Sequence, residues 1–438
     1  MRVRLISPAW QRLQPQTHYA LAPLGAAMVA GLTPADHEIS IEDDNISPVS
    51  ARPDADLVGI SLMLVCQAPR AFAIADAYRR LGVPVVIGGL SAGPLAGSCR
   101  PHADAVVVGE AEGNWPRVLR DARLGRLRPA YVRRGLAPPG AFALPRRDLL
   151  DPAGYAYRGL PMMSLLETSR GCCFSCPQCQ VPGISGARLR IRPLRKTVED
   201  ASAIEGERVY IVDNSLEQDE AYEKRLFGAL AGLGKRWVSH SISDTPAILK
   251  LAETAGWWFV LQTVTSASPR VAERIRRYHD HGIAVGAFVT LGFDEQGPDS
   301  FERIVDFLKE TRVDTAEFNL LTPFPGTPLF ERLKAQGRLL HEDWGRYNTD
   351  NVVFQPKLMS PERLRRGFLW AWREYYRDQS QAERMFHIYR RLGDLKDWKP
   401  AAEPAGRVIP HQEAGPTAVW GRTIPSVPRR RAPRRSGP

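Results

Sequence analysis

The sequence predicts an α/β protein with two successive parallel sheets: a Rossmann-like domain, then a partial (βα)6 barrel with a small helical C-terminal unit. Three observations predict this class. Short apolar runs alternate with helical patterns over the first 125 residues, and the alternation restarts at Pro161. The stretch between them, 124–160, is rich in Pro, Arg and Gly. The length of 438 residues is sufficient for two or three domains.

The first half of the alternation predicts a doubly wound sheet. Such sheets bind ligands beyond the carboxyl ends of their strands, here at residues 61–66, 88–93 and 109–112. Glycines at these ends let a flat ligand approach the backbone. We expect strands at 3–7, 38–42, 56–61, 84–89 and 105–110, and helices at 20–32 and 68–81.

The second half predicts six strand–helix units that form an open barrel, whose chemistry lies at the carboxyl ends of the strands. We expect strands at 163–168, 208–212, 237–242, 258–264, 283–290 and 315–320. The helices between them are expected at 194–204, 220–232, 245–255, 269–281, 300–310 and 326–337.

A cluster of cysteines follows the first barrel strand. Cys172, Cys176 and Cys179 are separated by three residues and then two, and Gly171 permits a sharp turn before them. Thiolates that converge in such a loop suit an iron–sulfur cluster or zinc. Zinc favours a fourth ligand at motif spacing, but Cys173 is adjacent to Cys172 and the nearest later histidine is His240.

This cysteine spacing after Thr-Ser-Arg-Gly resembles the radical S-adenosylmethionine (SAM) superfamily. The resemblance implies a 4Fe-4S cluster whose open iron chelates SAM and cleaves it to a 5′-deoxyadenosyl radical. Two residues depart from the pattern. Gln178 stands where an aromatic residue usually packs on the adenine of SAM, so Gln178 is a candidate SAM contact. Cys173 stands where the nearest relatives carry proline.

The N-terminal segments 55–61, 85–89 and 102–112 resemble the cobalamin-binding domain of one branch of this superfamily. The Asp-x-His-x-x-Gly motif that supplies an axial histidine in methionine-synthase-type domains is absent. The resemblance implies that cobalamin meets residues 62–65 without a histidine ligand. A domain that keeps the fold without the corrin is the alternative. Candidate cobalamin contacts are Ser61, Leu62, Gly88, Gly89, Gly109 and Glu110.

Resemblance also assigns candidate SAM contacts at the other barrel strand ends. We expect Asp213 and Asn214 to meet the methionyl or ribose groups, and Gly286 and Gly292 to let SAM lie against the backbone. Thr322 belongs to the matching segment 321–329. Acids that relatives carry are missing at Val212 and within 263–266. For each single residue, ordinary turn chemistry is the alternative.

The expected domains are 1–128 (cobalamin-binding-like), 129–160 (linker), 161–337 (radical SAM barrel), 338–395 (C-terminal unit) and 396–438 (disordered basic tail). Segment 337–347 resembles one that follows the barrel in cobalamin-dependent hopanoid methylases. Aromatic residues of the C-terminal unit either roof a substrate pocket or pack the unit onto the barrel: Trp344, Tyr347, Phe354, Trp370, Trp372 and Tyr375.

The composition indicates which classes of partner and which cellular compartment to expect. The net charge of +11 falls partly on the proline-rich tail and forms no basic–aromatic stripe, so we expect no nucleic-acid binding. Six cysteines, four of them clustered, favour a reducing compartment. The N-terminus is unlike a signal peptide, and the longest apolar run, 21–32, is too short to span a bilayer. We therefore expect a cytoplasmic protein with no transmembrane segment.

The resemblance predicts a cobalamin-dependent C-methyltransferase acting on an unactivated carbon of a small-molecule, natural-product or lipid substrate. It implies an electron donor such as flavodoxin or ferredoxin. No general base is needed at an sp3 carbon, and the sequence singles out no catalytic residue. Three alternatives remain: a related radical cyclase or oxidoreductase, a non-catalytic degenerate cobalamin or cluster partner, and a zinc-bound structural module.

Overall fold

The computed structural model describes residues 1–10, 20–133, 135–157 and 160–391. These residues fall within one compact unit of the chain, Met1–Lys396. The predicted basic tail, 396–438, lies outside the described residues. Within them, no helix is both long enough and apolar enough to cross a bilayer.

The N-terminal sheet has six parallel strands in the order β2-β1-β3-β4-β5-β6. The predicted α/β class is confirmed here, and five of the strands were predicted within two residues. β6 lies beyond the expected domain end at residue 128 and was missed, because a three-residue strand in a Pro- and Arg-rich stretch has no visible period. The bounds are β1 Arg2–Ser7, β2 Glu38–Asp43, β3 Leu57–Ser61, β4 Val85–Gly88, β5 Ala105–Val108 and β6 Ala130–Val132.

Helices cover both faces of this sheet, which is why its inner strands β3, β4 and β5 are almost entirely apolar. α1 (Leu24–Gly31) and α4 (Trp115–Arg123) share one apolar cluster with the sheet, and α2 (Ala68–Arg80) lies in the cluster on the other face. α1 begins four residues later than predicted, after Pro23. α3 (Ala96–Cys99) is a single turn between β4 and β5.

The second sheet also has six parallel strands, in the order β16-β15-β14-β13-β12-β9. In the described chain β9 and β16 each pair on one side only, so the barrel is open, as predicted. Its strands are β9 Ser164–Leu166, β12 Arg208–Ile211, β13 Arg236–His240, β14 Trp257–Val264, β15 Ala284–Leu291 and β16 Thr315–Leu320.

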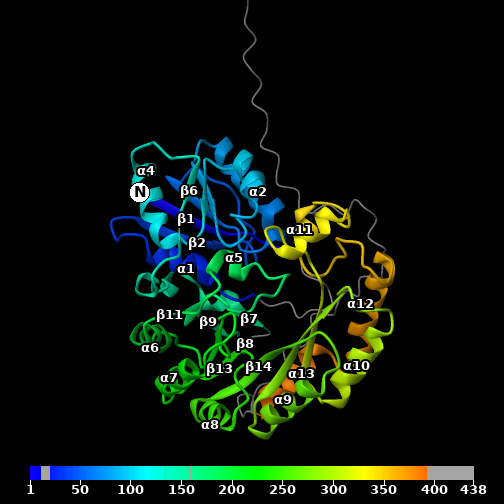
Figure 1. Ribbon diagram of the computed structural model, residues 1–438. Coiled ribbons are helices and arrows are strands. Elements are labelled where there is room, and N and C mark those ends of the chain that lie inside the picture. The colour runs from blue at the N-terminus through cyan, green and yellow to red at the C-terminus, as the bar shows by residue number, and fades with distance from the viewer. Residues whose placement is uncertain (11–19, 134, 158–159, 392–438) are drawn as a thin grey trace, which may run out of the picture. The chain divides into compact units, whose positions relative to one another are not determined.

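Helices follow the strands of this sheet in turn and cover its outer face (Figure 1). Outward residues such as Val209, Val260 and Val289 are buried with these helices in one apolar cluster. The inner-face residues of the same strands remain partly exposed at alternating positions. The helices are α6 Leu194–Ser202, α7 Glu220–Leu230, α8 Pro246–Ala255, α9 Pro269–Asp280, α10 Ser300–Glu310 and α11 Pro328–Ala335.

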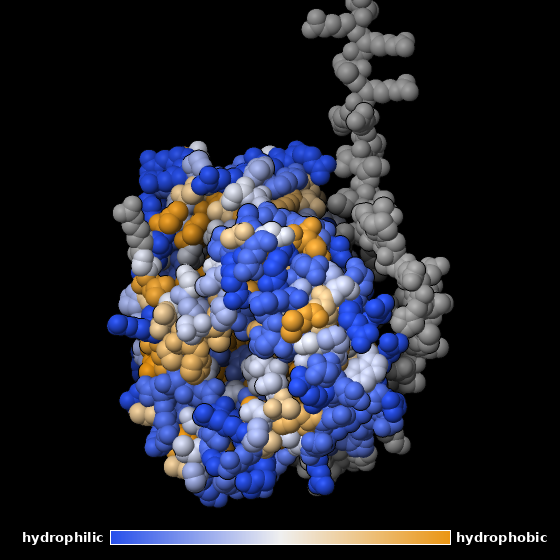
Figure 2. All heavy atoms as spheres, turned by 45° about the vertical axis from the view of Figure 1, so that its right-hand side comes forward, coloured by the Kyte–Doolittle hydropathy of each residue, from blue (hydrophilic) through white to orange (hydrophobic). Residues whose placement is uncertain are grey.

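The C-terminal unit contains α12 (Pro361–Tyr375) and α13 (Gln381–Arg391). Trp372 packs edge-on against Phe318 of β16 with ring centroids 5.5 Å apart, and Tyr347 is buried with residues of the N-terminal sheet and α2. Trp372 and Tyr347 therefore pack the unit onto the rest of the protein, whereas Trp370 is exposed. On the face drawn in Figure 2, hydrophilic residues predominate and apolar residues form separate patches.

Short elements surround the start of the barrel. β7 (Ala156–Tyr157) pairs antiparallel with β8 (Leu160–Pro161), and β10 (Ser169–Arg170) pairs antiparallel with β11 (Arg190–Ile191). Helix α5 (Val181–Ser185) lies between β10 and β11 in the chain. The cysteine cluster therefore sits in a loop, 171–189, whose two ends are held together by a strand pair.

Candidate functional site

Gly171 makes the turn into the cysteine loop. Its φ is +90°, and a Cβ at this position would lie 2.1 Å from the carbonyl oxygen of Arg188. Only glycine fits both conditions. The next N–H, that of Cys172, donates to the Gly186 oxygen at 3.0 Å and closes the loop again inside the β10–β11 pair. The predicted sharp turn is confirmed.

The three candidate ligand thiols are free and differ in exposure. Cys172 is 8% exposed, Cys179 is intermediate and Cys176 is exposed. Burial raises the pKa of Cys172 and of Cys179, so binding of a metal would have to displace their protons. In the part of the chain that is described, no three Cys, His, Asp or Glu side chains are gathered closely enough to hold a single metal ion. Ligands of a four-iron cluster bind different irons and need not meet at one point.

Gln218 fixes the cysteine loop and was not found by sequence reasoning. Its Oε1 accepts from the Cys173 N–H at 2.7 Å, while its Nε2 donates to the Gly171 oxygen at 3.3 Å and the Ser215 oxygen at 2.7 Å. One side chain thus joins the loop after β12 to both sides of the glycine turn. The signal that could have identified Gln218 in the sequence is its place in the loop that follows β12.

Asp213 lies under the start of the same loop. It is 2% exposed, and its carboxylate accepts from Thr168 and Ser169. Burial raises its pKa, against the lowering effect of these hydrogen bonds. Both oxygens accept hydrogen bonds from this turn, so Asp213 holds the turn in place. Its direct contact with SAM stays a prediction. Gln178, within the loop, and Asn214, next to Asp213 in the chain, are partly exposed.

The inner face of the barrel carries a second group of side chains that the sequence reading missed. The Tyr210 hydroxyl of β12 lies 3.2 Å from Nε2 of His240, which ends β13. The Phe288 ring of β15 lies 6.1 Å from the His240 ring. Burial lowers the pKa of His240, which favours the neutral imidazole. A neutral ring with a phenol partner can accept or donate a hydrogen bond to a substrate.

The two barrel glycines pack closely against other side chains. A Cβ on Gly286 would lie 2.7 Å from the Phe259 ring, and one on Gly292 would lie 2.9 Å from Leu364 of α12. That SAM lies against the backbone at these glycines stays a prediction. Thr322 is also buried, and its hydroxyl donates to the Leu320 oxygen at 3.0 Å.

The carboxyl edge of the N-terminal sheet gathers the predicted cobalamin contacts. Ser61 and Gly88, which pair in register, are partly exposed at the ends of β3 and β4, and Gly89 and Gly109 are exposed beyond β4 and β5. Both exposed glycines have positive φ, +105° and +87°. Four of the predicted cobalamin contacts are therefore accessible at this edge, and cobalamin binding there stays a prediction.

Leu62, another predicted cobalamin contact, differs in exposure from the two residues that follow it. Its side chain is fully buried in the cluster with α2, whereas Met63 is 50% exposed and Leu64 is 39% exposed. Gln67 Oε1 holds this loop by accepting from the N–H of Met63 at 3.0 Å and of Leu64 at 2.8 Å. The apolar surface expected at 62–65 is thus formed by Met63 and Leu64.

Glu110, also predicted as a cobalamin contact, lies in an ion-pair cluster. Its carboxylate accepts from Arg190 at 2.5 Å and from Arg170 at 3.2 Å. These arginines stand at the two ends of the cysteine loop. Glu110 therefore joins the N-terminal sheet to that loop.

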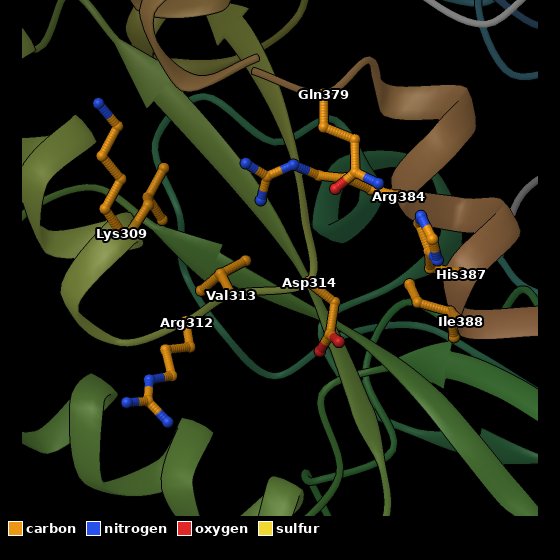
Figure 3. Close-up of a pocket in the computed structure, with 9 residues that line it drawn as sticks. Lys309, Arg312, Val313, Asp314, Gln379, Arg384, His387 and Ile388 are labelled. Atoms are coloured by element: carbon orange, nitrogen blue, oxygen red, sulfur yellow. The ribbon is translucent and has the colours of Figure 1, made fainter. Parts of the chain in front are cut away.

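A separate pocket of about 440 Å³ lies near the amino end of β16. Figure 3 shows Arg384 and His387 of α13 on one side of it and Lys309 and Arg312 on the other. Asp314, which directly precedes β16, also lines it. Barrel chemistry lies at the carboxyl ends of the strands, so this pocket is outside the candidate site.

Comparisons with known proteins agree with these features. A domain of unknown function (DUF4070) matches residues 327–413. Bacteriochlorophyllide d C-12(1)-methyltransferase of Chlorobaculum tepidum is 26% identical over 409 residues, 86% of this chain and 89% of that protein. Hopanoid C-2 methylase of Rhodopseudomonas palustris is 23% identical over 370 residues, 76% of this chain and 68% of that protein.

Among solved structures, the radical SAM methyltransferase TsrM of Kitasatospora setae, with cobalamin and a 4Fe-4S cluster bound, has a TM-score of 0.58. The sequence identity is 16%, and the match covers 84% of this chain and 85% of that one. The likeness confirms the predicted fold of two successive α/β units. Over most of its length the chain is thus similar in sequence to the bacteriochlorophyllide and hopanoid methyltransferases, and similar in fold to the radical SAM methyltransferase TsrM.

Proposed function

We propose that this enzyme transfers a methyl group to an unactivated carbon of a small organic substrate, and that it uses a 4Fe-4S cluster, SAM and cobalamin. The observation that carries the proposal is the cysteine loop. It follows the first barrel strand, its ends are held by the β10–β11 pair, and it presents three free thiols in a chain whose first sheet ends in the exposed Gly89 and Gly109.

The residues present fit these cofactors by their chemistry. Cys172, Cys176 and Cys179 would hold the cluster, because thiolates are the usual ligands of iron–sulfur clusters. Gln178 in the cysteine loop and Asn214 beside Asp213, both partly exposed, are our candidates for SAM. When bound, these groups supply the one-electron and methyl-transfer chemistry. For cobalamin, the candidates are Ser61, Met63, Leu64, Gly88, Gly89 and Gly109.

The side chains of the protein position these groups. Gln218 and Asp213 fix the two ends of the turn at Gly171, so the thiols are presented from a held backbone. Tyr210, His240 and Phe288 offer an aromatic surface with one neutral imidazole for substrate orientation. We assign none of these residues a proton-transfer step, because hydrogen abstraction from carbon by a radical needs no base.

The class of substrate is proposed only broadly. The relatives are named for bacteriochlorophyllide and hopanoid methylation, and a TsrM structure contains a tryptophan substrate. A small organic molecule is consistent with all of them. We also propose an electron donor of the flavodoxin or ferredoxin type.

Radical cyclisation is the second candidate. An anaerobic magnesium-protoporphyrin IX monomethyl ester cyclase of Cereibacter sphaeroides is 27% identical, but over only 34% of this chain. The mass of the product separates the two reactions, since methylation adds one methylene and ring closure adds none.

Reconstitution without oxygen tests the proposal. The full chain is supplied with iron, sulfide and hydroxocobalamin, desalted, and assayed for iron and corrin. We expect about four irons and one corrin per chain. A chain that retains iron but no corrin would contradict the cobalamin-dependent function and favour a cobalamin-free radical SAM protein.

A further inference from the structure

Two arginines face each other at the base of the cysteine loop. Arg170 of β10 and Arg190 of β11 are direct partners in the antiparallel pair that closes loop 171–189. Like charges placed opposite each other on neighbouring strands destabilise the pairing. Their side chains are only 15% and 13% exposed, so solvent screens the repulsion weakly. This strand pair therefore needs a counter-charge.

Glu110 supplies that charge from the other sheet. It follows Gly109 after β5, and one of its oxygens, Oε1, lies 2.5 Å from Arg190 Nη2 and 3.2 Å from Arg170 Nη1. Its second oxygen accepts from the Ala137 N–H at 2.5 Å. Burial raises the pKa of Glu110, but the hydrogen bond from Arg190 and its other partners outweigh burial and lower it. The carboxylate is therefore charged and bridges both arginines.

Further contacts hold the two guanidinium groups in place. Arg170 also pairs with Glu112 and Glu167, each at 2.7 Å, and lies over the Phe142 ring at 4.0 Å from its centroid. Arg190 donates to the Ser185 oxygen inside the cysteine loop at 3.0 Å. Arg190 is thus tied both to the loop and to groups outside it, whereas the Arg170 side chain is held by Glu112, Glu167 and Phe142 outside the loop.

We propose that Glu110, Arg170 and Arg190 are positioning residues that set the cysteine loop against the carboxyl edge of the N-terminal sheet, and so couple the cluster to cobalamin. Arg170 is separated from Cys172 only by Gly171, and Glu110 directly follows Gly109 on the predicted corrin edge. If Arg170 or Glu110 moves, the other residue is displaced as well, because breaking a largely buried ion pair is strongly unfavourable. The inference rests on the proposed function, because both cofactors belong to that proposal.

The test compares the reconstituted full chain with and without hydroxocobalamin. The readouts are the midpoint potential and electron paramagnetic resonance signal of the cluster. We expect cobalamin to shift both in the wild-type protein. Glu110→Gln should lose this shift while retaining iron and corrin. Glu199→Gln is the matched control, because Glu199 forms an exposed pair with Arg195 and should keep the shift.

A second variant tests whether a lost shift merely reflects misfolding. Arg170→Lys keeps the charge but loses the multiple N–H contacts of the guanidinium, so the shift should be reduced. Thermal unfolding without cofactors is measured for every variant. If Glu110→Gln keeps the full shift, or if both variants lose the fold together with the cofactors, the positioning role is overturned. If the wild-type protein retains no corrin, the proposed function is contradicted as well. This outcome distinguishes failure of the proposed function from failure of the positioning role alone.

Discussion

Asp213 and Thr168 are joined by two hydrogen bonds: the Thr168 N–H donates to Oδ1 at 2.7 Å and the Thr168 hydroxyl donates to Oδ2 at 2.5 Å. Thr168 lies beyond the end of β9 and Asp213 beyond the end of β12, two neighbouring strands of the barrel. The Ser169 hydroxyl donates to the same carboxylate at 2.5 Å. One buried acid therefore ties the second strand end to the turn from which the cysteine loop begins.

Removing this acid should weaken the cluster without touching a ligand. Asp213→Ala leaves the buried donors of Thr168 and Ser169 without their acceptor, and groups that orient metal ligands typically contribute about 10–100-fold in affinity. We expect reduced iron retention after desalting, with Asp213→Asn less affected. Asp280→Ala, at an exposed ion pair on α9, is the control. Wild-type iron retention in Asp213→Ala would contradict the positioning role.

The four clustered cysteines should not be equivalent. Cys172→Ala, Cys176→Ala and Cys179→Ala should each abolish the visible absorbance of the cluster, since each removes one thiolate. Cys173→Ala should retain most of it, because the contact of Cys173 with Gln218 is made by its backbone N–H. Iron content per chain is the measurement. A Cys173→Ala variant as damaged as the other three would show that the ligand assignment is wrong.

The sequence predicted the two sheets well because parallel strands covered on both faces, such as β4 and β5, are short apolar runs between helical patterns. It also predicted the sharp turn at Gly171, because that turn depends on the conformation of a single glycine. It could not predict contacts that depend on a distant partner. Phe259 packs against Gly286, and Glu110 pairs with Arg190, 80 positions away. Neither partner follows from the pattern of one strand.

The fold should be stabilised by mild acid through Glu223. This carboxyl is fully buried on α7, and burial raises its pKa to about 7. A raised carboxyl pKa contributes stability that is present below the unfolded value of about 4.5 and is lost as pH rises through about 7. We expect Glu223→Gln to lack this pH dependence, a difference of about 3 kcal/mol at most between pH 4 and 8. The measurement is the free energy of unfolding across that range, and parallel pH profiles for the two proteins would contradict the assignment.

Cobalamin should bind with no protein imidazole below the cobalt. The exposed loop residues beside the corrin edge, Met63 and Leu64, are apolar and cannot donate a nitrogen ligand. Electron paramagnetic resonance of the cob(II)alamin form is the measurement. We expect a spectrum without nitrogen superhyperfine splitting from the protein. A triplet from a histidine nitrogen would refute the assignment of this face.

The central claim is that one chain uses cobalamin to carry a methyl group from SAM. The most direct measurement incubates the anaerobically reconstituted protein with a reductant and SAM labelled in its methyl group, then separates the corrin from the protein and counts the label. We predict that label appears on the corrin, and that 5′-deoxyadenosine forms only when Cys172, Cys176 and Cys179 are all present. A protein that retains corrin but never labels it would contradict the claim.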